Sequence, residues 1–492
     1  MIRMHVSLSE IEPTKRIYCN RSLNLRNIKA VGFDMDYTLA LYKPEQFEVL
    51  AYNETLKKLV NMGYPDDILN WKFDISHMIR GLAIDKMRGN IIKLDRHRYV
   101  KVAYHGFREL VREERRALYD ASLMQSYEEP DYALIDTLFT LADAYLFAQL
   151  IDLKTQRPAE VKKTPIEIYR DVRHSIDLCH RDGSIKHKVA QEPSKYIERD
   201  PLLKETLNRL RQSGRQVFVV TNSLWDYTHV VMNHIFGNDS RNLSKDWLDY
   251  FDVVVTGAAK PSFFMSLNPL YEVDPDSGLL RNTDGILNRD SKIFQGGNFK
   301  QLHERLGIQT GPEILYVGDH IYGDILRSKK ELGWRTMLVI NELEAELVSL
   351  ERHKDEYRRY EELLQMKDNL EDELQRLQLE FSQLGAAGKG KTKSPKLDRA
   401  QQLQENIESL VEKRDATREA LRRSMKKYHQ NFHPVWGQLM KTGHQNSRFA
   451  AQVENYACLY TSKLTNLINY SPNFSFRSTR DFMPHDLMQP LL

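Results

Sequence analysis

Short apolar runs bounded by turn residues recur along much of the chain. Five occur, at residues 30–33, 217–220, 251–255, 314–317 and 336–340. Their β-branched and aromatic content is typical of parallel strands buried on both faces. Between these runs, residues recur at three-to-four-residue spacing, which predicts helices, as in Leu202, Leu203, Thr206, Leu207 and Leu210 before Gly214. Alternating strands and helices predict an α/β protein with a doubly wound parallel sheet.

The first two predicted strands are separated by many more residues than a crossover connection needs. We therefore predict that a cap domain is inserted at residues 61–199, and that residues 1–60 and 200–341 form the core. The patterns at residues 137–151 and 166–179 predict helices, so we expect the cap to be mainly helical.

Residues 342–429 differ in composition from the rest of the chain, because they are dense in Glu, Lys, Arg, Gln and Leu. A stretch rich in Gly, Lys and Ser interrupts them, so we predict a long charged helical hairpin with a loose tip. Some leucines form a partial apolar stripe suited to helix packing or a partner: Leu363, Leu370, Leu374 and Leu377. The tip lysines fit a solvated loop better than a nucleic-acid patch: Lys389, Lys391 and Lys393. Residues 430–492 return to mixed composition and are expected to pack on the core.

Composition narrows the class of protein. Hydrophobic residues make up 41% of the 492 positions, which excludes a wholly disordered chain. Lys and Arg number 71 against 68 Asp and Glu, so no global charge favours nucleic acid or a membrane surface. Cys19, Cys179 and Cys458 match no zinc, redox or disulfide spacing. No apolar run approaches the ~18 residues of a membrane span. We expect a cytoplasmic protein without a nucleic-acid or membrane partner.

Two aspartates, Asp34 and Asp36, follow the first predicted strand one residue apart, so an extended chain points both to the same side. Like charges at the end of a buried strand are costly unless a cation or a proton offsets them, and oxygen ligands suit Mg²⁺. The alternative is a helix N-cap and a turn with two ordinary exposed aspartates.

Polar residues also follow three later predicted strands, in chain order: Thr221, Asn222 and Ser223, then Lys260, then Asp319 and Asp324. Hydroxyl and amide donors suit a phosphate, although a Thr-Asn-Ser run alone is more typical of a helix cap. All these residues fall at the edge where open α/β sheets bind ligands, so the signals reinforce one another.

These motifs together resemble those of the haloacid-dehalogenase (HAD) superfamily of phosphotransferases. The resemblance implies that Asp34 is the nucleophile that takes the phosphoryl group, and that Asp36 is the general acid and base. It implies that Thr221 and Lys260 hold phosphate oxygens. It further implies a Mg²⁺ ion bound by Asp34, the main-chain carbonyl of Asp36 and Asp319, with Asp324 in support.

Within the predicted cap, Arg173, Asp177 and His180 are spaced to share one helix face, and Lys186 follows. A surface ion pair between Arg173 and Asp177 is the plain alternative. A closer resemblance is to the cytosolic purine 5′-nucleotidases that prefer IMP and GMP. The similar stretches are residues 32–39, 80–82, 89–90, 105–107, 171–173, 221–223, 260–264, 316–324, 333–336, 449–453 and 483–485. It implies that the substrate is bound by Phe139, Arg173, Asp177, His180, Lys186, Asn222 and Ser223.

We therefore expect a Mg²⁺-dependent 5′-nucleotidase that hydrolyses IMP and GMP through an aspartyl-phosphate intermediate. Phosphoryl transfer to nucleosides is expected as a further activity, and a homo-oligomer as the assembly. Two alternatives stay open: a HAD phosphatase for another small phosphoester, and a non-catalytic scaffold whose hairpin recruits partners. The presence of every motif carboxylate argues against the scaffold. Tyr322 and Asp136 stand where the vertebrate effector site has other side chains, so nucleotide activation is not predicted.

Overall fold

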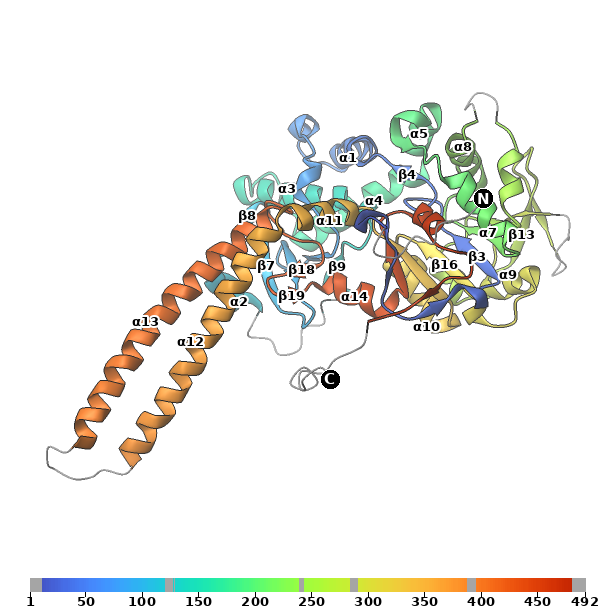
Figure 1. Ribbon diagram of the computed structural model, residues 1–492. Helices are drawn as coiled ribbons and strands as arrows, with labels where there is room; N and C mark the ends of the chain where they lie inside the picture. Colours follow the sequence, from blue (N-terminus) through green and yellow to red (C-terminus); the bar gives the residue numbers. More distant parts are fainter. Residues whose placement is uncertain are drawn as a thin grey trace. The chain divides into compact units, whose positions relative to one another are not determined.

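The computed structural model describes residues 11–119, 127, 129–238, 243–283, 291–386 and 395–479 (Figure 1). The chain divides into two compact units, Met1–Glu344 with Leu439–Leu492, and Ala345–Gln438. Within the described ranges, no helix combines the length and apolarity needed to cross a bilayer.

A mostly parallel sheet forms the centre of the larger unit. Among the described residues it has ten strands, in the order β1-β20-β17-β16-β3-β11-β12-β15-β13-β14. Their bounds are β1 Tyr18–Cys19, β20 Leu459–Thr461, β17 Arg335–Val339, β16 Ile314–Gly318, β3 Ala30–Phe33, β11 Gln216–Val220, β12 Val253–Thr256, β15 Ile293–Gly296, β13 Leu270–Val273 and β14 Leu280–Asn282. The strands from β20 to β15 run parallel. The predicted doubly wound α/β sheet is confirmed.

Strand β3 lies where the winding of the sheet reverses. The chain passes from β3 outward through β11, β12 and β15, then returns to the other side of β3 as β16 and β17. Such a switch point leaves a crevice at the carboxyl ends of the strands. Every residue of β3 is buried, and a Cβ on Gly32 would lie 2.2 Å from the ring of Phe218 in β11. Glycine at this position therefore leaves room for the ring of Phe218 against β3.

Helix α7, Leu203–Gln212, leads into β11 of this sheet. Helices α8 Trp225–Ile235, α9 Phe299–Leu306 and α10 Arg327–Leu332 come after β11, β15 and β16. Helix α7 confirms the expected helix, and Leu203, Thr206, Leu207 and Leu210 are buried. Leu202, the first residue of the pattern, precedes the helix and is exposed.

The inserted residues contain both helices and a second sheet. The helices are α2 Arg112–Tyr119, α3 Leu141–Gln156, α4 Pro165–Arg181, α5 Lys186–Gln191 and α6 Pro193–Tyr196. Helix α1, Pro44–Asn61, packs against α3 and α4. A five-stranded antiparallel sheet, in the order β8-β7-β6-β5-β9, was not predicted. Its strands are β5 Leu82–Asp85, β6 Asn90–Leu94, β7 Val100–His105, β8 Arg108–Glu109 and β9 Tyr132–Leu134. Polar residues buried within β5 and β6, such as Asp85 and Lys93, break the apolar runs that mark buried strands.

The smaller unit is built around a helical hairpin, as predicted. Helices α12, Lys354–Ala386, and α13, Pro395–Gln430, pack together after α11, Leu343–Arg352. Ion pairs show that they run antiparallel: Glu380 with Arg399, Glu371 with Arg418, and Glu356 with Lys427. Of the predicted stripe, Leu374 is buried and the other three leucines are partly buried. The tip lysines 389, 391 and 393 lie outside the described residues.

The segment after the hairpin returns to the larger unit. Helix α14, Arg448–Tyr456, leads into β20 of the main sheet, and β21, Ser475–Phe476, pairs with β2, Leu23–Asn24. Residues near both ends of the described chain therefore complete the same unit.

A buried carboxyl group lies on α1. The hydroxyl of Tyr37 donates to Glu48 Oε1 over 2.7 Å. Glu48 Oε2 has no partner within the described part of the chain. Burial raises the pKa of Glu48 to about 8. The folded protein therefore keeps a proton on Glu48 at a pH where the unfolded chain releases it.

We expect the stability of the Glu48→Gln variant, relative to that of the unmutated protein, to be higher at pH 7.5 than at pH 5. Between the ordinary glutamate pKa of 4.5 and about 8, the folded state holds the extra proton, so stability falls as pH rises. The neutral amide removes this loss, which is at most about 1.4 kcal/mol per pH unit. Thermal unfolding should show that the melting temperature of the variant minus that of the unmutated protein increases from pH 5 to pH 7.5.

Glu54→Gln on the same helix is the matched control of opposite sign. Burial alone raises the pKa of Glu54, but hydrogen bonds from Lys188 and Lys57 lower it overall. This variant should therefore lose stability relative to the unmutated protein as pH rises. A pH-independent difference for Glu48→Gln would contradict the buried protonated carboxyl.

Candidate active site

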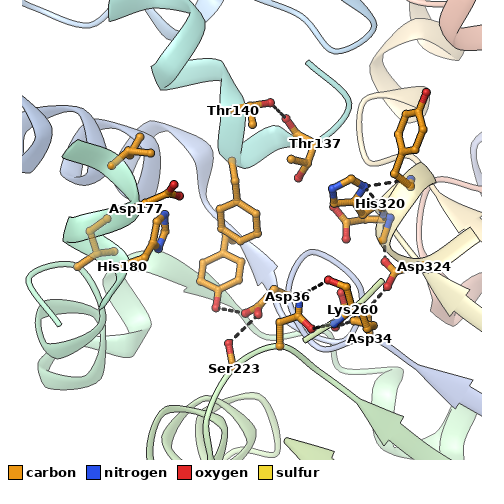
Figure 2. Close-up of a pocket in the computed structure, with 18 of the residues that line it drawn as sticks. Asp34, Asp36, Thr137, Thr140, Asp177, His180, Ser223, Lys260, His320 and Asp324 are labelled. Atoms are coloured by element: carbon orange, nitrogen blue, oxygen red, sulfur yellow. Dashed lines mark hydrogen bonds and ion pairs between the residues drawn. The ribbon is translucent and has the colours of Figure 1, made fainter. Parts of the chain in front are cut away.

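The polar residues that follow the central strands meet around one cavity (Figure 2). It has a volume of about 520 Å³ and lies at the carboxyl ends of β3, β11, β12 and β16. The predicted residues that line it here are Asp34, Asp36, Asn222, Ser223, Lys260, Asp319 and Asp324. The sheet topology thus brings together positions that lie far apart in sequence.

Three buried carboxylates form an acidic cluster in this cavity. Asp34, Asp319 and Asp324 each offer an oxygen, and these oxygens lie within 4.8 Å of one another. Asp319 Oδ2 is buried and has no hydrogen-bond partner in the described structure. Burial and the charge of Asp324 raise the pKa of Asp319 well above its usual range. Carboxylates held so closely need positive charge, and their oxygens suit a hard divalent cation.

Lys260 supplies part of that charge. Its Nζ lies 2.8 Å from Asp34 Oδ1 and 2.6 Å from Asp324 Oδ1, and it donates to the Tyr316 hydroxyl over 3.1 Å. Burial alone lowers the pKa of Lys260, but Asp324 and Asp34 outweigh it and raise the pKa overall. Burial likewise raises the pKa of Asp34 to about 7, although Lys260 opposes the shift. One ammonium group faces three carboxylates, so the site fits a further cation.

Asn222 fixes the backbone of Lys260. The Lys260 main-chain N–H donates to Asn222 Oδ1 over 2.6 Å, and Asn222 Nδ2 donates to the Lys260 carbonyl over 3.1 Å. The motif after β11 therefore positions the lysine after β12.

Arg80 supports the cluster from behind. Its guanidinium donates to the main-chain carbonyl of Asp319 over 3.0 Å and makes two hydrogen bonds to the carboxylate of Glu342. The side chain of Arg80 is 0% exposed. Arg80 therefore holds the Asp319 backbone, and its charge also acts against the burial that raises the pKa of Asp319.

Thr221 differs from its neighbours in placement. Its side chain is fully buried and is not among the residues that line the cavity. The Thr221 hydroxyl accepts from the main-chain N–H of Ser223 over 3.1 Å. In this structure Thr221 therefore shapes the turn that presents Ser223, and its role as a phosphate ligand stays a prediction.

The predicted cap residues line the opposite part of the same cavity: Phe139, Arg173, Asp177, His180 and Lys186. Arg173 donates to Asp177 Oδ1 over 2.7 Å. The rings of Phe139 and His180 lie 6.2 Å apart at 89°. Burial, with the charges of Lys186 and Arg173, lowers the pKa of His180 to about 4, so this ring is neutral at pH 7. Two aromatic rings beside a donor and an acceptor suit a polar aromatic ligand.

Sequence reasoning missed Asp143, which holds Arg173 from the other side. Asp143 Oδ2 accepts from Arg173 over 2.9 Å, and the residue is 3% exposed. Burial raises the pKa of Asp143 to about 6. A charged residue within the otherwise apolar start of α3 was the available signal.

Three other residues were also missed: Tyr42, Tyr227 and His320, all of which line the cavity. The ring of His320 accepts from the main-chain N–H groups of Tyr322 and Gly323 over 3.2 Å each. It therefore shapes the turn between Asp319 and Asp324.

Comparison with known proteins agrees with this geometry. The model of the 5′-nucleotidase family matches residues 17–488. A 5′-nucleotidase domain-containing protein of Dictyostelium discoideum is 30% identical over 98% of this chain and 77% of its own length. The human 5′-nucleotidase domain-containing protein 2 is 27% identical over 96% of this chain and 85% of its own length.

Among solved structures, a HAD phosphatase from Thermococcus onnurineus has a TM-score of 0.25 and 16% identity, covering 64% of this chain and 87% of that one. At this score it adds nothing to the sequence matches. Because the family model matches most of the chain, the protein belongs to the 5′-nucleotidase family of phosphoric monoester hydrolases.

Proposed function

We propose that the protein is a Mg²⁺-dependent 5′-nucleotidase that hydrolyses IMP and GMP through an aspartyl-phosphate intermediate. One observation carries this proposal: a single cavity holds Asp34 and Lys260 with the acidic cluster, and also Arg173, Asp177 and two aromatic rings. The first group suits a phosphate and the second a purine base. Family membership supports the same substrate class.

Asp34 is the nucleophile in this proposal. Its carboxylate attacks phosphorus, the bond from phosphorus to the ribose 5′-oxygen breaks, and Asp36 gives its proton to that oxygen. Asp36 then takes a proton from water, which attacks the aspartyl-phosphate and releases phosphate. A nucleoside hydroxyl in place of water gives phosphoryl transfer.

Lys260 and Asn222 would hold the phosphate oxygens, as they line this part of the cavity. Ser223 would lie beside the phosphate, with its hydroxyl donating to Asp36. Asp34, Asp319 and the main-chain carbonyl of Asp36 would hold Mg²⁺, supported by Asp324, and the ion when bound would neutralise phosphate charge. The unpartnered Asp319 Oδ2 and the excess of carboxylates over lysine support this ligand set.

Hydrogen-bond polarity supports 6-oxopurine bases. Hypoxanthine and guanine present an O6 acceptor beside an N1–H donor, whereas adenine presents an N6 donor beside an N1 acceptor. Arg173 only donates and an ionised Asp177 only accepts, so this pair complements the 6-oxopurines and opposes adenine. Phe139 and His180 would hold the faces of the ring.

Asp34→Asn should lower kcat for IMP by at least about 10³-fold, because the amide keeps the shape but removes the nucleophile. Circular dichroism should show an unchanged fold, and Asp274→Asn on the β13–β14 connection should keep full activity. Beryllofluoride should form its adduct on Asp34. An adduct on another residue would contradict the assignment.

Asp319→Asn should weaken divalent-cation binding by roughly 10- to 100-fold, because it removes an oxygen ligand from the cluster. Isothermal titration with Mg²⁺, and with Mn²⁺ as a second probe, measures this without turnover. Asp143→Asn is the matched control, since Asp143 is equally buried but outside the cluster. Equal affinity of the Asp319 variant and the unmutated protein would remove the proposed metal site.

The kcat/KM for IMP and GMP should exceed that for AMP by on the order of 10²-fold or more, because adenine would cover Arg173 and Asp177 without offering them complementary hydrogen bonds. Asp177→Asn should narrow the gap, since an amide can also donate to adenine N1. Asp171 lies on the same helix and its carboxylate accepts from Tyr64 and Lys163. Asp171→Asn should leave the ratio of kcat/KM for IMP to kcat/KM for AMP unchanged. Equal kcat/KM for AMP and IMP in the unmutated protein would exclude this base assignment. Sugar phosphates in the same panel test the other-phosphoester alternative.

A further inference from the structure

Two tyrosines outside the four motifs stand beside Asp36. Tyr42 belongs to β4, Leu41–Tyr42, and Tyr227 belongs to α8, and both line the cavity. The Tyr42 hydroxyl donates to Asp36 Oδ1 over 2.6 Å, and the two tyrosine hydroxyls lie 2.9 Å apart. Both side chains are 5% exposed. Neither hydroxyl takes part in the proposed steps of hydrolysis or phosphoryl transfer.

The direction of these hydrogen bonds follows from their chemistry. The Tyr42 hydroxyl has one proton, and this proton lies in the hydrogen bond to Asp36 Oδ1. The Tyr42 oxygen is then the acceptor in its contact with Tyr227, so Tyr227 donates to Tyr42. Burial raises the pKa of both hydroxyls, which keeps them neutral donors. A directed chain runs from Tyr227 through Tyr42 to Asp36.

The second oxygen of Asp36 is held independently. Ser223 Oγ donates to Asp36 Oδ2 over 2.9 Å (Figure 2). Each oxygen of a carboxylate has two acceptor sites, so each keeps one site for a proton. The two contacts therefore fix the plane of the carboxyl group while leaving it able to exchange a proton.

Packing prevents Tyr42 from turning away. Its ring lies 4.6 Å from that of Phe47 and 5.1 Å from that of Tyr37, between ring centroids. Its backbone pairs with Ile197 in β10, Ile197–Glu198. These ring contacts and the backbone pairing hold the Tyr42 hydroxyl in a defined position.

We propose that Tyr42 is a positioning residue that aims the carboxyl group of Asp36 at the leaving oxygen, and that Tyr227 fixes the hydroxyl of Tyr42. This inference rests on the proposed role of Asp36 as general acid and base. As the bond to the leaving oxygen breaks, the proton of Asp36 passes to that oxygen. The carboxylate that results is stabilised by hydrogen bonds from Tyr42 and Ser223, which strengthen when the acceptor becomes charged. Tyr42 keeps its own proton throughout.

The test is the dependence of kcat/KM on the leaving group. IMP has a poor leaving group that needs a proton, whereas p-nitrophenyl phosphate has a good one that does not, and substituted phenyl phosphates lie between them. Tyr42→Phe should lower kcat/KM for IMP by about 10-fold or more, a part of the usual contribution of general acid catalysis. The value for p-nitrophenyl phosphate should change by less than about 3-fold, because its departure needs no positioned acid. The loss for IMP should lie in kcat, with KM little changed.

Tyr52→Phe is the matched control. Tyr52 is also a buried tyrosine, and its hydroxyl donates to Gln149 Oε1 over 2.6 Å, but Tyr52 does not line the cavity. This variant should keep the leaving-group dependence of the unmutated protein. Tyr227→Phe should show the Tyr42→Phe pattern at smaller size, and it carries the test if Tyr42→Phe does not fold.

Equal losses for all leaving groups, or no loss, would overturn the inference. Asp36→Asn in the same series separates this failure from failure of the proposed function. If Asp36→Asn changes the leaving-group dependence and Tyr42→Phe does not, only the role of Tyr42 is wrong. If neither does, the assignment of Asp36 is wrong as well.

Discussion

The site is organised by the need to balance three carboxylates buried at one end of a parallel sheet. Asp34 and Asp319 directly follow the adjacent strands β3 and β16, and Asp324 lies in the helical segment Ile321–Leu326 after β16. Lys260 contacts Asp34 and Asp324. Burying this set without cations would cost several kcal/mol per ion. Asn222 hydrogen-bonds to the backbone of Lys260, and Arg80 hydrogen-bonds to the main-chain carbonyl of Asp319. Both contacts fix the backbone of residues that carry these charges. The excess of carboxylates over lysine therefore favours a further cation in this crevice.

The inserted residues extend this charged end of the cavity with a different chemistry. Helix α4 presents Arg173 and Asp177, and Asp143 on α3 fixes Arg173 from the side away from Asp177. A guanidinium held by two carboxylates keeps its plane and loses little conformational freedom when it meets a base. Tyr42 connects the two ends, since its hydroxyl contacts Asp36 and its ring packs near Phe139.

The sequence was informative where local pattern and sheet topology coincide. The five apolar runs became strands, and the polar residues after them met because parallel strands end at one edge. It was uninformative where contacts are long-range or polar groups are buried. Nothing local marks Tyr42 as the partner of Tyr227, which lies 185 positions away. The sheet containing Asp85 and Lys93 was missed because these buried polar residues interrupt its apolar runs. Asp85, for example, accepts from the hydroxyl of Tyr119, 34 positions away.

The edge-to-face contact between Phe139 and His180 has a consequence for the kinetics of ligand entry. Two rings that sandwich a purine must lie parallel and about 7 Å apart, since each stacked gap is about 3.5 Å. Here the rings are perpendicular with centroids 6.2 Å apart. For the proposed purine site, one ring would have to rotate and the gap would have to widen before a base could enter. Association would then be a two-step process, in which a ligand without a base would complete only the first step.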